Sequence, residues 1–460
     1  MADRWAAYRY KLAKNPTHSS VTRQEDCSTP RFGQHCGVND VSVTSTTGDP
    51  RRDGPLAGVR VLDLSRVLAG PHCGRNLAHL GAEVIKIESP EGDLTRYSHP
   101  RVNSIATYFT QQNCGKDSLS LDLSHPDGAS IFRRLAAVSD VVLENFRPEV
   151  MDRLGVGYRS LAAENPRLVY CAITGYGLTG PWKNRRAYAT VIGAESGFLW
   201  AENREAGHVT APAEMSHGDT YCALYASNAI VAALYQRERS GRGQLIDVSM
   251  TESLLSANEH AHAHLLDDLD HDNLVISFEP SAYPVFTTGE GRQVAISGHP
   301  AERGTFERYC RGVNRPELID DGRFATIPLR KRALVELIAE LQLGAARFAT
   351  AQDLEASFAR ESLAMGIIRT VREVADSDWS AARNAVVEVS DRAGGTVRIP
   401  NSPWHFSDAS TGVYGEPKYR GEDNRTVLQR ILHLDDTEID RLETTTVLSS
   451  RVPHGNPPVA

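Results

Sequence analysis

The chain has 460 residues, 41% of them hydrophobic, so it can bury a large core as two domains or as one elaborate α/β unit. Its formal net charge of −8 argues against a general binder of nucleic acids or anionic membranes, because neither surface attracts an acidic protein. The sequence contains no apolar run of about 18 residues and no secretory signal at its start, which predicts a cytoplasmic protein.

Residues 1–53 are predicted to form a disordered N-terminal extension. They are rich in Thr, Ser, Arg and Asp and contain few apolar runs. Such a segment cannot bury enough surface to offset the entropy lost when it becomes ordered. Its basic start has some features of an organelle signal, but Asp3, Glu25 and Asp26 favour a solvated tail.

Alternating strands and helices predict a large first domain. Residues 59–64 are typical of a strand, a helix runs from Pro71 to Gly81, and residues 83–87 predict a second strand. The same unit recurs as a helix over 126–138 and strands from 140 and 167. This order predicts an α/β fold with a doubly wound, Rossmann-like parallel sheet, in a large domain over residues 54–274.

The elements then become shorter and change their order. We interpret residues 244–250 as a strand, 253–266 as a helix and 282–296 as a hairpin that turns at Gly289 and Gly291. These elements predict a smaller α+β domain over residues 275–360. Residues 361–460 are expected to return to the large domain, where strand-like segments around Gly394 and Gly395 are candidates to rejoin its sheet.

One carboxylate at a helix start is the leading candidate for chemistry. Asp219 follows Gly218, whose flexibility suits such a site, and precedes about five turns of helix that end near Gly241. By position alone, Asp219 is an N-cap. It is also placed to act as a nucleophile, because a helix N-terminus favours the ionised carboxylate and nearby amides can stabilise an oxyanion.

The loop from Ser65 to Pro71 is a second candidate, because it joins the first strand to its helix at the edge where open α/β sheets bind ligands. It lacks the G-x-G-x-x-G pattern, which disfavours a standard dinucleotide site.

The sequence predicts no metal site. The seven cysteines are scattered and contain no C-x-x-C pair, which predicts reduced thiols and no structural zinc. His260, His262 and His264 raise a metal hypothesis, because His260 and His264 share a helix face next to Glu259. Without a further acidic ligand, polar or packing histidines are the favoured interpretation.

Several longer motifs occur in order between Pro55 and about Pro403. They are PLAGVRVLDLSRVLAGP, LGAEVIKIE, NCGKDSLSLDL, VLENFRPEVMDRLG, GYGLTGP, HGDTY, ERSGRGQLIDVSM and DDGRFAT. Together these segments resemble the family III CoA-transferases, the group that contains formyl-CoA transferase and carnitine CoA-transferase, with α-methylacyl-CoA racemase as a relative.

The resemblance implies that acyl-CoA is the substrate, that no cofactor is tightly bound, and that Asp219 is the catalytic nucleophile. CoA requires cations for its phosphates and an apolar slot for its adenine. The substrate-side residues that the resemblance implies are Leu68, Tyr188, His217 and Gly218. The CoA-binding residues that it implies are Val67, Leu68, Ala69, Leu121, Asn145, Phe146, Arg153 and Arg186.

The chain departs from the family pattern at four places. Ser89 and Ser124 stand where members carry an Arg and a Lys, so the phosphate contacts are expected to be partly rebuilt. Ala189 replaces the acidic residue that commonly follows the tyrosine matched by Tyr188. A glycine-rich flap of formyl-CoA transferase is missing between residues 275 and 285, which argues against formyl-CoA and oxalate as the substrate pair.

The expected reaction moves CoA from an acyl-CoA donor to a small carboxylic acid. A dicarboxylate fits if Arg185, Arg186 or His217 pairs with its second carboxylate. An acyl-CoA racemase or epimerase is an alternative that requires a base on each side of the α-carbon, and a non-catalytic CoA-binding protein is another. The resemblance also implies a homodimer of interlocked chains, with no nucleic acid or membrane partner.

Overall fold

The computed structural model describes residues 53–202, 215–266 and 283–451. The predicted N-terminal extension lies outside these ranges except for Asp53, and most of the segment that lacks the glycine-rich flap also lies outside them. In these ranges, no helix combines the length and the apolar character that a membrane span requires.

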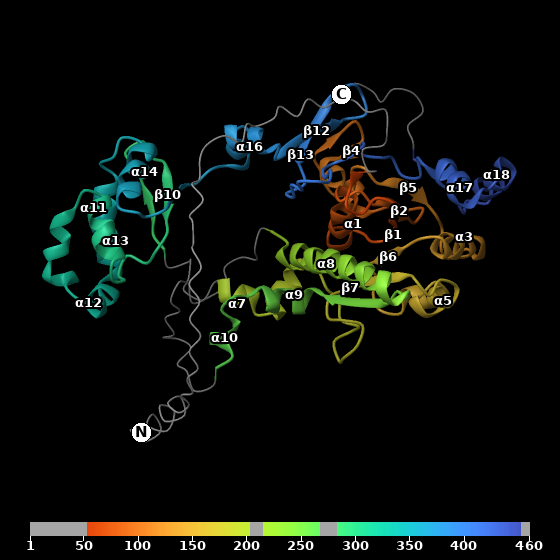
Figure 1. The fold of residues 1–460 in the computed structure, drawn as a ribbon, viewed down its shortest axis with the longest axis horizontal. Coiled ribbons are helices and arrows are strands. Elements are labelled where there is room, and N and C mark those ends of the chain that lie inside the picture. Colours follow the sequence, from red (N-terminus) through yellow and green to blue (C-terminus); the bar gives the residue numbers. More distant parts are fainter. Residues whose placement is uncertain (1–52, 203–214, 267–282, 452–460) are drawn as a thin grey trace, which may run out of the picture. The chain divides into compact units, whose positions relative to one another are not determined.

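A six-stranded sheet forms the centre of the larger body (Figure 1). In spatial order its strands are β5 (Asp117–Ser120), β2 (Glu83–Glu88), β1 (Arg60–Asp63), β6 (Val141–Glu144), β7 (Val169–Thr174) and β8 (Leu245–Ser249). Every neighbouring pair is parallel. Two strands added on one side of β1 and three on the other make the doubly wound order, so the predicted parallel sheet is confirmed.

Helices cover both faces of this sheet, because successive side chains of a strand point to opposite faces. Val61 packs in the core under α1 (Ala69–His79) and α8 (His217–Ser240). Its neighbour Leu62 packs in the core on the opposite face. That core receives side chains from α3 (Pro126–Ala137), α5 (Tyr158–Glu164), α17 (Asn424–Leu432) and α18 (Asp436–Thr444). Figure 1 shows these four helices on the side of the sheet away from α1.

The C-terminal segment covers the β5 edge with side chains and not with a strand. The Ser118 N–H donates to Asp423 Oδ2 (2.9 Å), and the Ser120 N–H donates to Asn424 Oδ1 (2.8 Å). The segments β12 (Val386–Ser390) and β13 (Thr396–Pro400) form a separate antiparallel pair and do not rejoin the large sheet. At β5 the reason is physical, because those edge donors are already satisfied.

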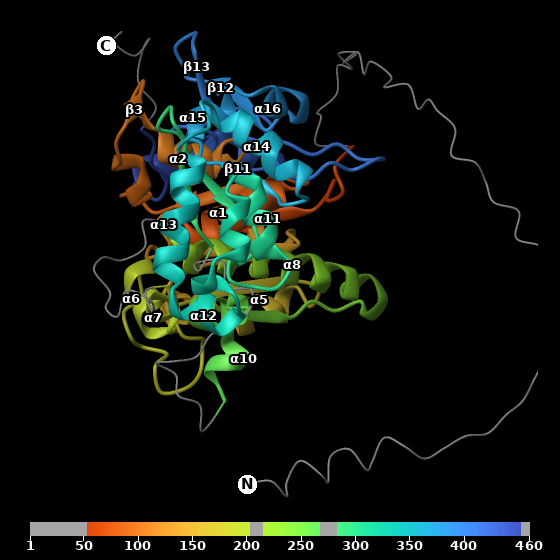
Figure 2. The same cartoon turned by 90° about the vertical axis from the view of Figure 1, so that its left-hand side faces the viewer.

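A smaller sheet and its helices form a second core. The predicted hairpin is confirmed as β9 (Val285–Thr287) and β10 (Gln293–Ile296), and β11 (Met365–Ile367) pairs with β10 from beyond residue 360. Phe286, Tyr309 and Phe358 fill the core under this sheet. Figure 2 shows the surrounding helices gathered in one bundle: α11 (Thr305–Gly312), α12 (Ile327–Arg332), α13 (Leu334–Ala345) and α14 (Ala351–Arg360).

The helix predicted over 253–266 is interrupted. It forms α9 (Met250–Ala257) and a single turn, α10 (Ala261–His264). Asn258 ends α9 with extended backbone, and its side-chain oxygen accepts a hydrogen bond from the His260 N–H (3.0 Å). Asparagine competes for backbone donors in this way and so favours helix ends.

Candidate active site

The candidate site lies where the order of the sheet reverses. The neighbouring strands β1 and β6 lead to connections on opposite sides of the sheet, and such a switch point leaves a crevice at the carboxyl ends of the strands. The loops after the two strands are tied together there. The Arg66 N–H donates to Asn145 Oδ1 (2.8 Å), and Asn145 Nδ2 donates to the Arg66 carbonyl (2.8 Å).

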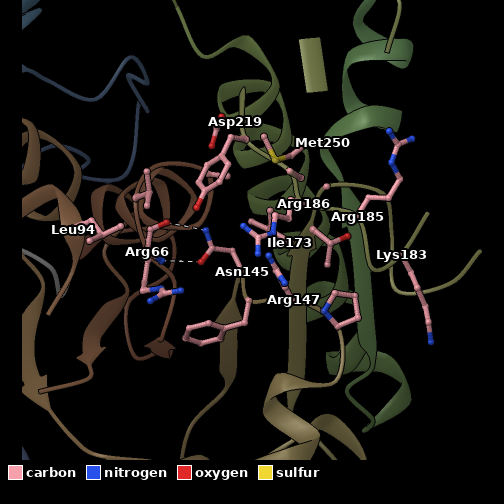
Figure 3. Close-up of a pocket in the computed structure, with 18 residues that line it drawn as sticks. Arg66, Leu94, Asn145, Arg147, Ile173, Lys183, Arg185, Arg186, Asp219 and Met250 are labelled. Atoms are coloured by element: carbon pink, nitrogen blue, oxygen red, sulfur yellow. Dashed lines mark hydrogen bonds between the residues drawn. The ribbon is translucent and has the colours of Figure 1, made fainter. Parts of the chain in front are cut away.

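A cavity of about 190 Å³, here called the reactive cavity, opens at this crevice (Figure 3). Among the residues that line it are Val67, Ala69, Asn145, Phe146, Arg186, Tyr188 and Asp219. The structure therefore brings seven of the predicted site residues together, although they come from four separate segments of the chain. Asp219 is its one lining carboxylate among the described residues.

Asp219 is the third residue of α8, whose N-cap is Ser216. The interpretation of Asp219 as an N-cap is therefore wrong, because the helix begins two residues earlier. Gly218 has ordinary helical backbone and serves close packing more than flexibility: an added Cβ would lie 3.2 Å from Ile192 Cγ2 and 3.5 Å from Leu254 Cδ1. The side chain of Asp219 is thus free of a capping role and points toward the reactive cavity.

The surroundings of Asp219 leave it without a cationic partner. Burial raises the pKa of Asp219 to about 6, while the backbone N–H groups of Ala69 and of Asp219 itself lower it. Ala69 is the first residue of α1, so the positive end of that helix faces the carboxylate. At pH 7 most of the carboxylate is still ionised, as a nucleophile requires.

Tyr108 is a neighbour that the sequence did not indicate. It lies on α2 (Thr107–Asn113), and burial together with the charge of Asp219 raises the pKa of Tyr108 to about 12. Its hydroxyl is therefore a proton donor at neutral pH. No motif marks Tyr108, because it reaches the site through packing of α2 and not through the sheet.

Five cations also line the reactive cavity, and three of them already have partners. Lys183 pairs with Glu149 (3.0 Å), Arg185 pairs with Glu195, and the Arg66 guanidinium lies 5.1 Å from the Phe146 ring centre. Arg147 and Arg186 form no ion pair with the described residues. In Figure 3 these two point into the centre of the cavity, whereas Lys183 and Arg185 extend away from Asp219. Arg147 lies within the motif NFRPEV but was not predicted as a site residue.

A second cavity of about 320 Å³, here called the nucleotide cavity, shares Arg66 and Phe146 with the first. The predicted residue Leu121 lines it, as do Ser89 and Ser124. Its lining carboxylates are Glu88, Glu91, Asp93 and Asp122. Arg66 is its one lining cation among the described residues, so this cavity is much less positive than the first.

Four predicted residues line neither cavity. Leu68 is the N-cap of α1, Gly218 is packed inside α8, and Arg153 is exposed at the end of α4 (Val150–Arg153). His217 packs on Phe198, with ring centres 5.0 Å apart. His217 and Asp219 are two residues apart on a helix, which turns their side chains about 200° away from each other.

The chain matches the family described as CoA-transferase family III over residues 56–424. It is 33% identical over 416 residues to the succinyl-CoA:glutarate CoA-transferase of Mus musculus, covering 87% of this chain and 93% of that protein. It is 30% identical over 399 residues to the succinyl-CoA–L-malate CoA-transferase beta subunit of Chloroflexus aurantiacus, covering 86% and 98%. A crystal structure of a CAIB/BAIF family protein from Brucella suis has a TM-score of 0.72 and 31% identity, covering 82% of this chain and 100% of that one.

The chain belongs to CoA-transferase family III. The resemblance inferred from the motifs is thereby confirmed, and the protein is a CoA-transferase. Both serines that replace expected cations of this family, Ser89 and Ser124, line the nucleotide cavity. The departure from the family pattern therefore concerns the substrate site itself and not a remote surface.

The histidines of the metal hypothesis are spread over two short elements in this CoA-transferase. His260 precedes α10, His262 and His264 lie within it, and His262 Nδ1 lies 3.1 Å from the Glu259 carbonyl oxygen. In the part of the chain that the structure describes, no group of three or more His, Cys, Asp or Glu side chains is arranged to hold a metal ion.

Proposed function

We propose that this CoA-transferase moves CoA from an acyl-CoA to a small dicarboxylic acid, with Asp219 as the nucleophile. The observation that carries the proposal is a partly buried carboxylate without a cationic partner, in a cavity lined by five cations. The named relatives are transferases for glutarate and malate, which are both dicarboxylic acids.

The reaction consists of exchanges at an acyl carbon. The Asp219 carboxylate attacks the thioester carbonyl, the C–S bond breaks, and an aspartyl anhydride and the CoA thiolate result. The thiolate then attacks the aspartyl carbonyl of the anhydride, which releases the donor acid and leaves an aspartyl-CoA thioester. The acceptor carboxylate attacks this thioester and forms a second anhydride, and the thiolate attacks its acceptor carbonyl to give the new acyl-CoA and free Asp219.

The backbone at the start of α1 suits the charge that develops in each step. Every attack places negative charge on a carbonyl oxygen beside Asp219, where the Ala69 N–H and the positive end of α1 lie. Donors that are fixed before the reaction stabilise such an oxyanion without reorganising. Burial of Asp219 serves a second purpose, because water that reached the anhydride would hydrolyse it.

The charge of the reactive cavity favours a dicarboxylate over a monocarboxylate. An acceptor that reacts through one carboxylate brings its second charge into the cavity, and that charge requires a cation. Arg186 and Arg147 both have unpaired guanidinium groups there. A guanidinium binds a carboxylate or a phosphate through two parallel hydrogen bonds. Arg186 and Arg147 are therefore the groups available to the acid and to the phosphates of CoA.

The two connected cavities also accommodate the length of CoA. The adenine fits the nucleotide cavity between Leu121 and Phe146, and the pantetheine arm passes Asn145 and Val67 to reach Asp219. Tyr188 is 69% exposed at the mouth of the reactive cavity, on the substrate side. The substrate-side role of His217 has no support from its position and remains only an implication of the family.

We also propose a homodimer of interlocked chains. Its support is the apolar surface along α8, where Leu224 is 44% exposed and Tyr235 is 67% exposed. An exposed apolar surface of this kind is typical of a subunit interface. Light scattering is expected to report a dimer, and a stable, active monomer would contradict the interlocked form.

The decisive experiment replaces Asp219 with Asn. The variant keeps the shape of the side chain but cannot form an anhydride, so turnover with succinyl-CoA and glutarate should fall about 10³-fold or more while CoA binding stays unchanged. Wild type incubated with succinyl-CoA and then hydroxylamine should carry the modification on Asp219, as peptide mass spectrometry reports. Asp152→Asn, at an exposed carboxylate that lines neither cavity, is the matched control. Normal turnover of Asp219→Asn, or labelling elsewhere, would exclude the nucleophile.

A further inference from the structure

Val67 has a backbone conformation that its side chain opposes. Its φ is +68°, in the left-handed region that β-branched residues avoid. It lies in the loop between β1 and α1, two residues before Ala69. A residue held in this region persists only where its surroundings impose it, and such residues concentrate at functional sites.

Two buried side chains impose the conformation. The Val67 N–H donates to both carboxylate oxygens of Asp93 (3.3 and 3.2 Å), and Lys86 Nζ donates to Asp93 Oδ2 (3.1 Å). Lys86 Nζ also donates to the Ser65 carbonyl, so the pair holds the loop on both sides of Arg66. The side chains of Lys86 and Asp93 are 1% and 0% exposed.

Both members of this pair carry their charges. Burial raises the pKa of Asp93, but the Lys86 charge and the Thr95 N–H outweigh burial and lower that pKa to about 2. The Thr95 N–H and hydroxyl both donate to Asp93 Oδ1, at 3.0 and 2.9 Å. A charged and fully bonded acceptor holds the Val67 N–H more firmly than a neutral one.

A second buried pair fixes the other end of the loop. Lys116 Nζ donates to Asp63 Oδ2 (2.8 Å) and to the Pro71 carbonyl (2.9 Å), while the Ser65 N–H donates to Asp63 Oδ1 (3.0 Å). The residues on both sides of the strained segment are therefore immobile. The direction of the Ala69 N–H depends on the one backbone conformation left to set, which is that of Val67.

We propose that Asp93, held by Lys86, is a positioning residue that keeps Val67 in the left-handed conformation and so aims the Ala69 N–H at the Asp219 carboxylate and at the oxyanion formed there. The inference rests on the proposed function of Asp219 as the nucleophile. Neither the motifs nor the family resemblance assigned a role to Asp93 or Lys86.

The test compares Asp93→Asn with Asp93→Asn/Val67→Gly. The neutral asparagine side chain is no longer held firmly by Lys86, so Val67 should relax and withdraw the Ala69 N–H. Loss of one oxyanion donor predicts a fall in kcat of about 100-fold with little change in KM for acyl-CoA. Glycine adopts positive φ without strain, so the second substitution should restore kcat about tenfold. Unchanged kcat in Asp93→Asn, or no restoration by glycine, overturns the proposal.

The pH profile supplies a measurement that a general loss of folding does not imitate. The Ala69 N–H lowers the pKa of Asp219, so its withdrawal should move the acidic midpoint of the acylation rate upward from about pH 6. The titratable neighbours that respond to Asp219 are Tyr108 and Cys222, whose pKa values are both raised to about 12. Neither titrates near the midpoint. An unshifted midpoint in Asp93→Asn contradicts the proposal.

A further variant guards against misfolding. Asp93→Asn leaves Lys86 buried without its counterion, which is strongly destabilising. Lys86→Met/Asp93→Asn removes both charges together and should show the same fall in kcat and the same shift in midpoint. The Asp219→Asn variant separates the two proposals. If Asp219→Asn remains active, the nucleophile is wrong; if it is inactive and the Asp93 variants are normal, only the positioning role is wrong.

Discussion

The reactive and nucleotide cavities share a wall but treat their carboxylates in opposite ways. In the nucleotide cavity, Glu88 pairs with Arg96 (2.6 Å) and Asp93 pairs with Lys86 (3.1 Å). In the reactive cavity, Asp219 has backbone N–H groups near it and no ion-pair partner among the described residues. Burial is common to Asp93 and Asp219, yet the pKa is about 2 for the first and about 6 for the second.

This difference separates support from chemistry. A carboxylate paired with a lysine is fully ionised, and its lone pairs are committed to fixed donors, which suits it for holding a loop. A carboxylate that meets only backbone dipoles keeps its lone pairs available for attack on a carbonyl carbon. The cations of the reactive cavity then remain free for the charges of the substrates.

The largest expected effect concerns the unpaired cations of the reactive cavity. Arg186→Ala should raise KM for acyl-CoA, for the acceptor acid, or for both by about 10- to 100-fold, because hydrogen bonds to charged groups contribute about 1.5–3 kcal/mol. Arg153→Ala is the matched control, since Arg153 lines neither cavity. Initial-rate kinetics with each substrate varied in turn measure the effect. A larger effect at Arg153 would reverse the assignment that the structure favours.

The next effect is the pH dependence of acylation. Because the pKa of Asp219 is raised to about 6, its reactive anion is present above this pH and is lost as the pH falls. We expect the single-turnover rate of CoA release to fall about tenfold for each pH unit below 6. Asp93 stays ionised over this range because its pKa is about 2. A midpoint near pH 4 would show that Asp219 is no less solvated than an ordinary aspartate.

The sequence predicted the sheet because its strands and helices alternate with clear hydrophobic patterns, and the motifs identified the family. It placed Asp219 correctly in the first turn of a helix but assigned its capping alternative to the wrong position, since the helix begins at His217. Both errors at helix ends, here and at Asn258, arose because side-chain competition for backbone donors decides where a helix ends.

The electrostatics of the site were not predictable from the sequence. A helix N-terminus lowers the pKa of a nearby carboxylate, so Asp219 was expected to be readily ionised. In the structure, burial outweighs that effect, and burial depends on the packing of segments distant in the chain. The same holds for Tyr108, Arg147 and the Lys86–Asp93 pair, whose roles depend on which loops meet at the crevice.

A smaller effect is expected from adding a cation to the nucleotide cavity. Ser124 lines this cavity and donates its hydroxyl to Asp122 (2.6 Å). Ser124→Lys places a charge beside the nucleotide and should tighten CoA binding about fivefold at low salt, the size of one exposed ion pair. Isothermal titration at low and high ionic strength measures it, because screening should reduce the gain. Ser124→Ala controls for the lost hydroxyl. Weaker binding by Ser124→Lys would place the phosphates elsewhere.

The smallest effect is on stability, and its sign distinguishes the two kinds of carboxylate. The folded protein raises the pKa of Asp219 from 3.8 to about 6, so the ionised group opposes folding above that pH and the cost disappears as the pH falls below about 4. A shift of two units corresponds to at most about 3 kcal/mol, and solvent screening of a partly exposed group reduces it. Asp219→Asn should therefore raise Tm by about 2–4 °C at pH 8.

The same comparison at lower pH removes the effect. At pH 4 wild-type Asp219 is protonated in the folded protein, so Asp219→Asn and wild type should have nearly equal Tm values in scanning calorimetry. Asp93→Asn should behave in the opposite manner and lower Tm at pH 8, because it breaks a buried ion pair. A stabilising Asp219→Asn beside a destabilising Asp93→Asn would show that the fold tolerates a cost at the nucleophile that it does not incur at its support. If Asp219→Asn is also destabilising at pH 8, the backbone N–H groups outweigh burial, and the nucleophile is held as firmly as the residues that position it.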